Sequence, residues 1–231
     1  MNKIKKILVF FILFIGMVLF PYIPIELFHI NLNNLSQNIK IIYSFVCDLG
    51  YLIIVFMVYS KRNINSLKDY YKNFKKYFRI SILYYVIGLI IMYISNNIIS
   101  LYFTEAVANN DIAVKDLINK YPIYMLFSTL IYAPIVEETI FRRSIKDIIL
   151  SFENNKITKY IYIVISGLLF ALMHIIGMVN SNLDYLYIIP YLSIGIAFAA
   201  IYYKTDNLFT TITLHALHNL MAVIIYFSIG V

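Results

Sequence analysis

Apolar residues are gathered into seven long runs that are separated by short polar or charged segments. The runs lie near residues 7–26, 41–60, 80–103, 121–143, 160–179, 185–203 and 208–229. A helix of roughly 20 mostly apolar residues is long enough to cross the hydrocarbon core of a bilayer. The pattern therefore predicts an all-α integral membrane protein. We expect a polytopic helical bundle of about seven transmembrane helices, within a range of six to eight.

The composition supports a lipid environment. Hydrophobic residues make up 61% of the 231 residues and charged residues 13%, which is too little polar surface to cover a water-soluble globule. No internal repeat or polar linker divides the chain, so we expect one transmembrane domain over residues 1–231. The last four runs, within residues 121–225, are expected to form its functional core.

Positive charge is distributed unevenly between alternate loops. With a cytoplasmic N-terminus, the inside segments hold 16 of the 19 Lys and Arg residues, and the outside segments keep Lys40, Lys115 and Lys120. Such asymmetry is typical of positive-inside sorting. It predicts a multi-pass protein of the cell membrane whose C-terminus lies outside. The net charge of +7 does not indicate nucleic-acid binding, because the basic residues form no continuous face.

The most basic segment, residues 61–79, alternates Lys and Arg with tyrosines and phenylalanines. Such a pattern suits a segment that lies on an anionic leaflet with its rings among the headgroups. A loop that only fixes the topology is the alternative.

Ionisable side chains within an apolar run indicate a functional site, because their insertion into hydrocarbon costs a few kcal/mol each. The fourth run contains Glu137, Glu138 and Arg142. Glu138 and Arg142 are four residues apart and share a helix face, whereas Glu137 points about 100° away from Glu138. We therefore expect one carboxylate to pair with Arg142 and the other to face the bundle interior. Pro134 either kinks this helix or begins a helical segment.

Two further runs supply imidazoles and an amide. His174 follows Ser166 and Phe170 at intervals of four, and His215 and Asn219 are again four residues apart. A histidine in such a place is often only a hydrogen-bonded core residue. Together, however, the three runs offer a carboxylate as general base, imidazoles that orient water or bind a metal, and an amide donor for an oxyanion.

At these residues the sequence resembles the CPBP family of intramembrane proteases, which groups CAAX-processing prenyl endopeptidases with bacteriocin-processing and immunity proteins, the Abi family. The family motif Glu-Glu-x-x-x-Arg matches residues 137–142, Phe-x-x-x-His matches residues 170–174, and His-x-x-x-Asn matches residues 215–219. The three motifs occur in the family order on three apolar runs. The resemblance covers roughly residues 121–225.

The resemblance implies an intramembrane endopeptidase that hydrolyses a peptide bond of a membrane-associated protein or peptide precursor. Glu137 would activate water with help from His174, His215 and Asn219 would stabilise the oxyanion, and Glu138 and Arg142 would brace the site. Zinc held by Glu137, His174 and His215 is an open alternative, and no organic cofactor is expected. Straight helices would place these residues at different depths, so tilts or misplaced boundaries must bring them together.

Two other functions compete with hydrolysis. A bacteriocin immunity or regulatory membrane protein of the same fold would bind its partner without cleaving it. A small transporter or proton-coupled channel would also use buried Glu, His and Arg residues, as proton relays do, but no inverted repeat between the halves supports it.

Overall fold

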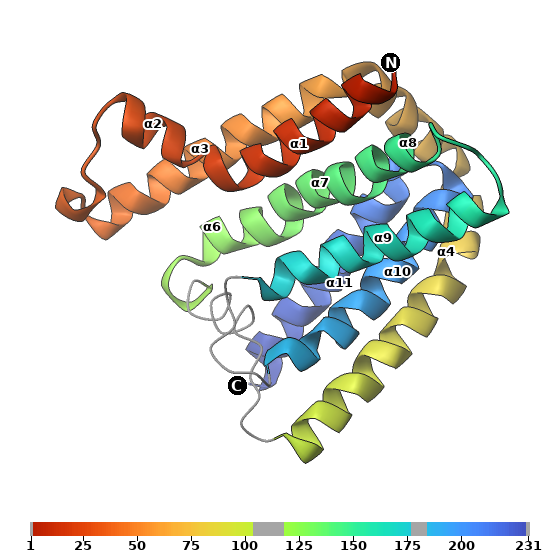
Figure 1. The fold of residues 1–231 in the computed structure, drawn as a ribbon. Coiled ribbons are helices and arrows are strands. Elements are labelled where there is room, and N and C mark those ends of the chain that lie inside the picture. Colours follow the sequence, from red (N-terminus) through yellow and green to blue (C-terminus); the bar gives the residue numbers. More distant parts are fainter. Residues whose placement is uncertain (1, 104–117, 177–183, 230–231) are drawn as a thin grey trace.

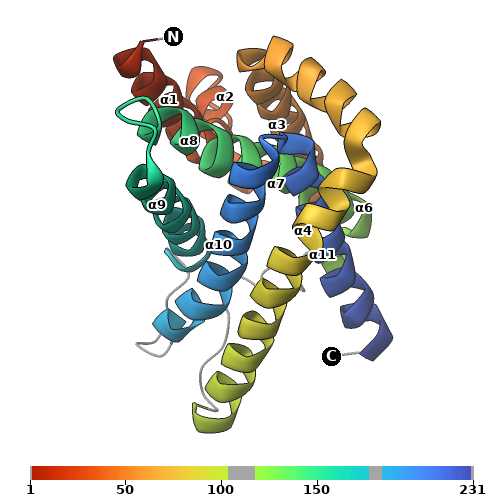
Figure 2. The same ribbon diagram turned by 90° about the vertical axis from the view of Figure 1, so that its right-hand side faces the viewer.

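The structure is a computed structural model that describes residues 2–103, 118–176 and 184–229. Every regular element in these residues is helical, which confirms the expected all-α class. The long helices pack side by side as a bundle, and α1 begins and α11 ends at opposite ends of it (Figures 1 and 2).

The first apolar run forms two helices instead of one. Helix α1 (Lys3–Leu19) is followed after a short turn by α2 (Tyr22–Leu27). The break lies at Pro21, which has no backbone N–H to continue the α-helical hydrogen bonds. Both pieces are fixed to the next long helix, because Tyr51 donates a hydrogen bond to the carbonyl of Leu13 and Tyr43 donates one to that of Pro21.

The second and third runs form α3 (Gln37–Val58) and α4 (Ser60–Tyr102). Helix α4 is 43 residues long because the basic segment at 61–79 is itself helical and continues into the apolar run. The backbone leaves helical geometry at Asn73, and α4 bends in its upper part (Figure 2). The basic segment is therefore a helical extension of a membrane span, with a kink at Asn73.

The fourth run forms an almost continuous helical rod from Pro122 to Ile149. It consists of α6 (Pro122–Phe127), the π-helical segment η2 (Ser128–Tyr132), α7 (Ala133–Glu137), a second π-helical segment η3 (Glu138–Ser144) and α8 (Ile145–Ile149). The rod continues six residues beyond the expected end at residue 143. Each π-helical segment widens the helix by one residue, which rotates the side chains that follow.

The last runs form α9 (Lys156–Ile175), α10 (Ile188–Thr205), preceded by the short η4 (Asp184–Tyr187), and α11 (Leu208–Ile229). The final residues of the expected 160–179 span, 177–179, lie outside the described residues. Asn155 begins α9 with a capping box, and Asn207 caps α11 by accepting from the N–H groups of Phe209 and Thr210 at 3.1 and 3.3 Å. Caps of this kind satisfy N–H groups that have no partner within the helix.

Six helices of the described chain are long and apolar enough to cross a membrane, which confirms a polytopic helical membrane protein. They correspond to the second to seventh runs. The first run supplies α1, which is 17 residues long.

The basic segments gather at one end of the bundle. Lys3 lies 4.8 Å from the Phe152 ring, and Lys146 forms an ion pair of 2.7 Å with Asp206. Arg62 and Asp147 also form an ion pair. The segments that were predicted to be cytoplasmic are therefore neighbours in space. The side of the membrane on which they lie stays a prediction.

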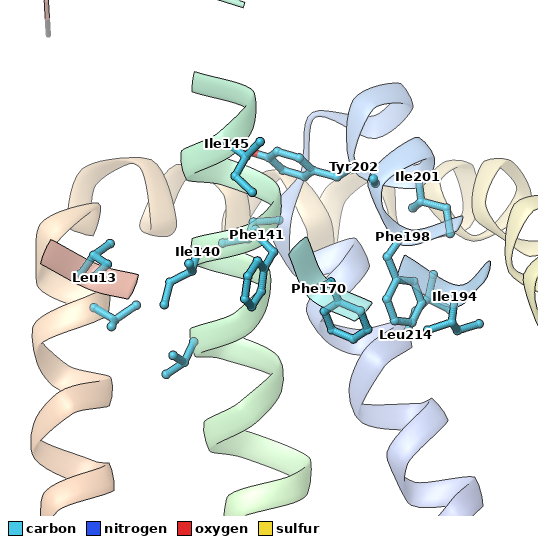
Figure 3. Packing of buried hydrophobic residues seen from close by; sticks show 14 of the residues in the cluster. Leu13, Ile140, Phe141, Ile145, Phe170, Ile194, Phe198, Ile201, Tyr202 and Leu214 are labelled. Carbon is cyan, nitrogen blue, oxygen red and sulfur yellow. The ribbon is translucent and has the colours of Figure 1, made fainter. Parts of the chain in front are cut away.

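The core lies among the rod, α9 and α10. Figure 3 shows Phe141, Phe170 and Phe198 near one level of it, each from a different helix. Helices α9 and α10 approach each other closely at Gly167 and Gly195, because an added Cβ at Gly195 would lie 2.8 Å from the carbonyl oxygen of Gly167. The small residues thus serve packing, as in other membrane helix pairs.

Substituting Gly167 with alanine should therefore destabilise the bundle. The new methyl group would lie 2.9 Å from the backbone nitrogen of Ile196 and 2.7 Å from its Cγ1, and overpacking of this kind costs about 1–3 kcal/mol. Thermal unfolding in detergent measures the loss. Gly50→Ala is the matched control, because its methyl group would meet only the Phe20 ring at 3.5 Å. Equal unfolding midpoints for the two variants would contradict the packing argument.

Candidate active site

Glu138 and Arg142 form a fully buried ion pair. Arg142 Nε donates to Glu138 Oε2 at 3.0 Å, and neither side chain is exposed. The pair expected from the four-residue spacing is therefore present, although both residues lie in the π-helical segment η3. A buried charge is tolerated only where it is paired and hydrogen-bonded.

Arg142 also links the rod to α9. Its Nη1 donates to the carbonyl oxygen of Ser166 at 3.4 Å and to the Ser166 hydroxyl at 3.3 Å. Ser166 in turn donates to the carbonyl of Phe141 at 2.7 Å. The guanidinium lies 4.5 Å from the centre of the Phe170 ring and 5.9 Å from that of Phe198. Arg142 is thus held from three sides and fixes the direction of the Glu138 carboxylate.

His215 of α11 is bound to the other oxygen of Glu138. Its Nδ1 lies 3.0 Å from Glu138 Oε1, and an ionised carboxylate can only accept, so Nδ1 carries the proton. His215 is buried. Its second nitrogen, Nε2, faces Glu137 Oε2 at 4.0 Å. Glu138 therefore orients the imidazole and directs Nε2 towards the neighbouring carboxylate, as outer partners orient catalytic or metal-binding histidines elsewhere.

Glu137 has a different environment from Glu138. Its side chain is 19% exposed, and its Oε2 atom is buried without a hydrogen-bond partner among the described residues. The two adjacent carboxylates thus differ as their directions on the helix predicted: one is locked in an ion pair, and the other keeps an oxygen free for a further ligand.

His174 reaches this cluster through Phe170. Its Nδ1 lies 2.9 Å from the carbonyl oxygen of Phe170, one turn earlier on α9. The Phe170 ring lies 4.4 Å from the His174 ring and 5.8 Å from the His215 ring, measured between centroids. The centre of the Tyr191 ring also lies 4.7 Å from that of the His174 ring. The two motif histidines are therefore neighbours of one phenylalanine ring.

Asn219 binds the rod at the first π-helical segment. Its Nδ2 donates to the carbonyl oxygen of Thr129 at 2.8 Å. That carbonyl lacks both usual partners, because the N–H of Ala133 bonds to Ser128 instead and Pro134, the next residue, has no N–H. Asn219 thus replaces a missing backbone donor. One proton of its amide nitrogen remains available to another acceptor.

The candidate metal ligands are Glu137, His174 and His215. Over the described residues, no three His, Cys, Asp or Glu side chains come close enough together to hold a metal ion. The three residues as placed therefore do not fit the three-ligand zinc site that was the open alternative. Zinc stays a prediction that metal analysis of the purified protein would test.

Several contacts of the site could not be found from the motifs. The hydroxyl oxygen of Tyr85 on α4 lies 3.3 Å from His218 Nδ1, and the Tyr85 ring stacks on the Phe198 ring. Asp48 of α3 accepts a hydrogen bond of 2.9 Å from Tyr124. Tyr85 and Tyr124 belong to runs rich in aromatic residues, so no spacing distinguishes them from other packing residues.

Comparison with known proteins agrees with the three motifs. Residues 119–221 match the family model of type II CAAX prenyl endopeptidase Rce1-like proteins. The chain is also 28% identical over 212 residues to the UPF0177 protein YajF of Lactococcus lactis, with 89% of this chain and 95% of that protein covered. No solved structure matches the chain significantly. The matched segment contains Glu137, Glu138, Arg142, His174, His215 and Asn219. The Rce1-like match therefore supports a peptidase embedded in the membrane and confirms the resemblance to the CPBP family of intramembrane proteases.

Proposed function

We propose that this protein is an intramembrane endopeptidase that cleaves a membrane-associated protein or peptide precursor. The proposal is supported above all by the gap between Glu137 and His215. Glu137 Oε2 and His215 Nε2 are 4.0 Å apart, which is too long for a direct hydrogen bond. Glu137 Oε2 is itself buried, so a water oxygen about 2.8 Å from each atom would bridge them once the side chains move apart to admit it.

In this scheme Glu137 is the general base. Its free oxygen accepts a proton from the bridging water as the water oxygen forms a bond to the peptide carbonyl carbon. The same carboxylic acid then returns the proton to the leaving nitrogen as the C–N bond breaks. His174, whose ring contacts the same Phe170 ring as His215, assists the activation of water.

His215 and Asn219 stabilise the oxyanion that forms on the carbonyl oxygen. Asn219 has one amide proton that Thr129 does not use, and His215 donates from Nε2 when its ring is protonated. Glu138 and Arg142 do not react in this scheme. Because they are locked to each other and to Ser166, they keep His215 in place, and preorganised donors need no rearrangement during the reaction.

A comparison of membrane proteomes tests the assignment and searches for the substrate. Cells that carry the intact protein should contain a shortened form of a membrane protein or peptide. Cells that carry Glu137→Gln at the same level should accumulate the uncut precursor. If the membranes are identical and the variant protects cells against a bacteriocin as well as the intact protein does, a non-catalytic immunity function replaces the peptidase.

A further inference from the structure

The first part of α4, residues 60–79, forms an arm that is docked on the bundle by one face. Arg143 donates a hydrogen bond to Asn63, and both side chains are buried. Asn207 Nδ2 donates to the carbonyl oxygen of Ser66 at 2.8 Å and to Asp69 Oδ2 at 2.9 Å. The arm is therefore held firmly at the end of the bundle where the basic segments gather (Figure 2).

A stripe of apolar side chains follows the arm beside the docked face. It recurs at intervals of three and four residues, which places its members on one side of each of the two helical pieces that meet at Asn73. The members are Ile64, Leu67, Tyr71, Phe74 and Phe78. Tyr71 is 75% exposed, and Phe74 and Phe78 are about half exposed, at 48% and 50%. No described element covers these rings, although the arm itself is fixed.

A basic stripe runs next to the apolar one. At about 100° per residue, its members lie roughly one quarter of a turn from the apolar stripe. They are Lys61, Lys68, Lys72, Lys75 and Arg79, all exposed. Asp69, the one acidic residue between 60 and 79, is occupied by hydrogen bonds from Asn73, Tyr77 and Asn207. The free surface of the arm therefore carries positive charge alone.

We propose that the arm is an interfacial helix that binds anionic phospholipid headgroups of the leaflet into which α4 descends. Exposed aromatic rings beside lysines are the surface that such helices place between headgroups and acyl chains. The arm continues directly into the apolar part of α4, so it begins at the membrane surface and cannot move far from it. Charge complementarity selects lipids with a negative headgroup over neutral ones.

The depth of single labelled positions tests the first half of the proposal. Cys47 is the one cysteine and is buried, so a Cys47→Ala background permits single-cysteine variants. Spin labels at Tyr71→Cys and Phe74→Cys, in bilayers of phosphatidylcholine and phosphatidylglycerol, should be several-fold more accessible to oxygen than to a water-soluble nickel complex. A label at Asn65→Cys, exposed on the basic side, should show the opposite preference. Equal accessibility at all three positions would overturn the proposal.

The headgroup preference tests the second half. A fluorophore at Phe74→Cys should be quenched more by spin-labelled phosphatidylglycerol than by spin-labelled phosphatidylcholine at the same mole fraction. We expect the preference to be largely lost when Lys68, Lys72 and Lys75 are all changed to Gln, because each lysine near an anionic surface strengthens the attraction to it. The corresponding Lys→Arg variant keeps the charge and should keep the preference.

Two results would contradict the headgroup assignment. Equal quenching by both lipids would show that the arm does not prefer the anionic headgroup. Position 74 could instead become shielded from water only after an acidic peptide is added to the detergent-solubilised protein. That result would assign the face to a protein partner. Neither experiment measures hydrolysis. The proposal about the arm can therefore be wrong while the peptidase proposal holds, and the peptidase proposal can be wrong while the arm binds lipid.

Discussion

Replacing Glu137 with glutamine should lower the rate of peptide hydrolysis by the purified protein by roughly 10²–10⁴-fold and leave its stability unchanged. Glutamine has nearly the same shape, but it cannot accept a proton from water. Because Glu137 Oε2 has no hydrogen-bond partner among the described residues, the substitution removes no contact that holds the fold. The rate is measured with a substrate found by the proteomic comparison, and stability is measured by thermal unfolding in detergent.

Glu26→Gln is the matched control for this experiment. It makes the same chemical change at an exposed residue of α2, so it should alter neither the rate nor the unfolding midpoint. A Glu137→Gln variant that turns over substrate within a few-fold of the unchanged protein would reject Glu137 as the base. A variant that loses activity only because it unfolds would also fail to support the role.

The different environments of Glu137 and Glu138 follow from the sequence because they depend on local helix geometry. Two adjacent residues point in different directions on any helix, and a four-residue spacing brings Glu138 to Arg142. In the structure Glu138 is paired with Arg142, and Glu137 has a separate environment. The six expected runs after the first could likewise be placed, since an apolar stretch of sufficient length needs no partner to be identified.

The contacts between helices could not be predicted in the same way. Asn219 binds Thr129 because a π-helical segment and Pro134 leave that carbonyl without its usual donors, and a regular period of 3.6 residues gives no sign of such a widening. The length of the rod bears on the difference in depth that straight helices would give the site residues. Arg142 and Arg143 are buried, where they pair with Glu138 and Asn63. The fourth span therefore does not end at these arginines, and the helix continues to Ile149.

Replacing Glu138 with glutamine should, unlike the change at Glu137, destabilise the protein. The fully buried Arg142 would lose its charged partner, and breaking a buried pair from one side costs about 3–5 kcal/mol. The same substitution removes the carboxylate that orients His215. We therefore expect a lower unfolding midpoint in detergent and, where folded protein can be recovered, a loss of activity.

A second substitution separates the ion pair from a general weakness at this position. Arg142→Met in the Glu138→Gln background removes the unpaired charge and should regain part of the lost stability, because replacing both members of a buried pair with neutral groups is often nearly neutral. The two single variants and the double variant form a thermodynamic cycle whose coupling energy measures the pair. If Glu138→Gln were as stable as Glu137→Gln, the bracing role of Glu138 and Arg142 would be wrong. The Glu138 carboxylate would then not be needed to hold His215 in position, and the proposed arrangement of Glu137 and His215 for activating water would require another support.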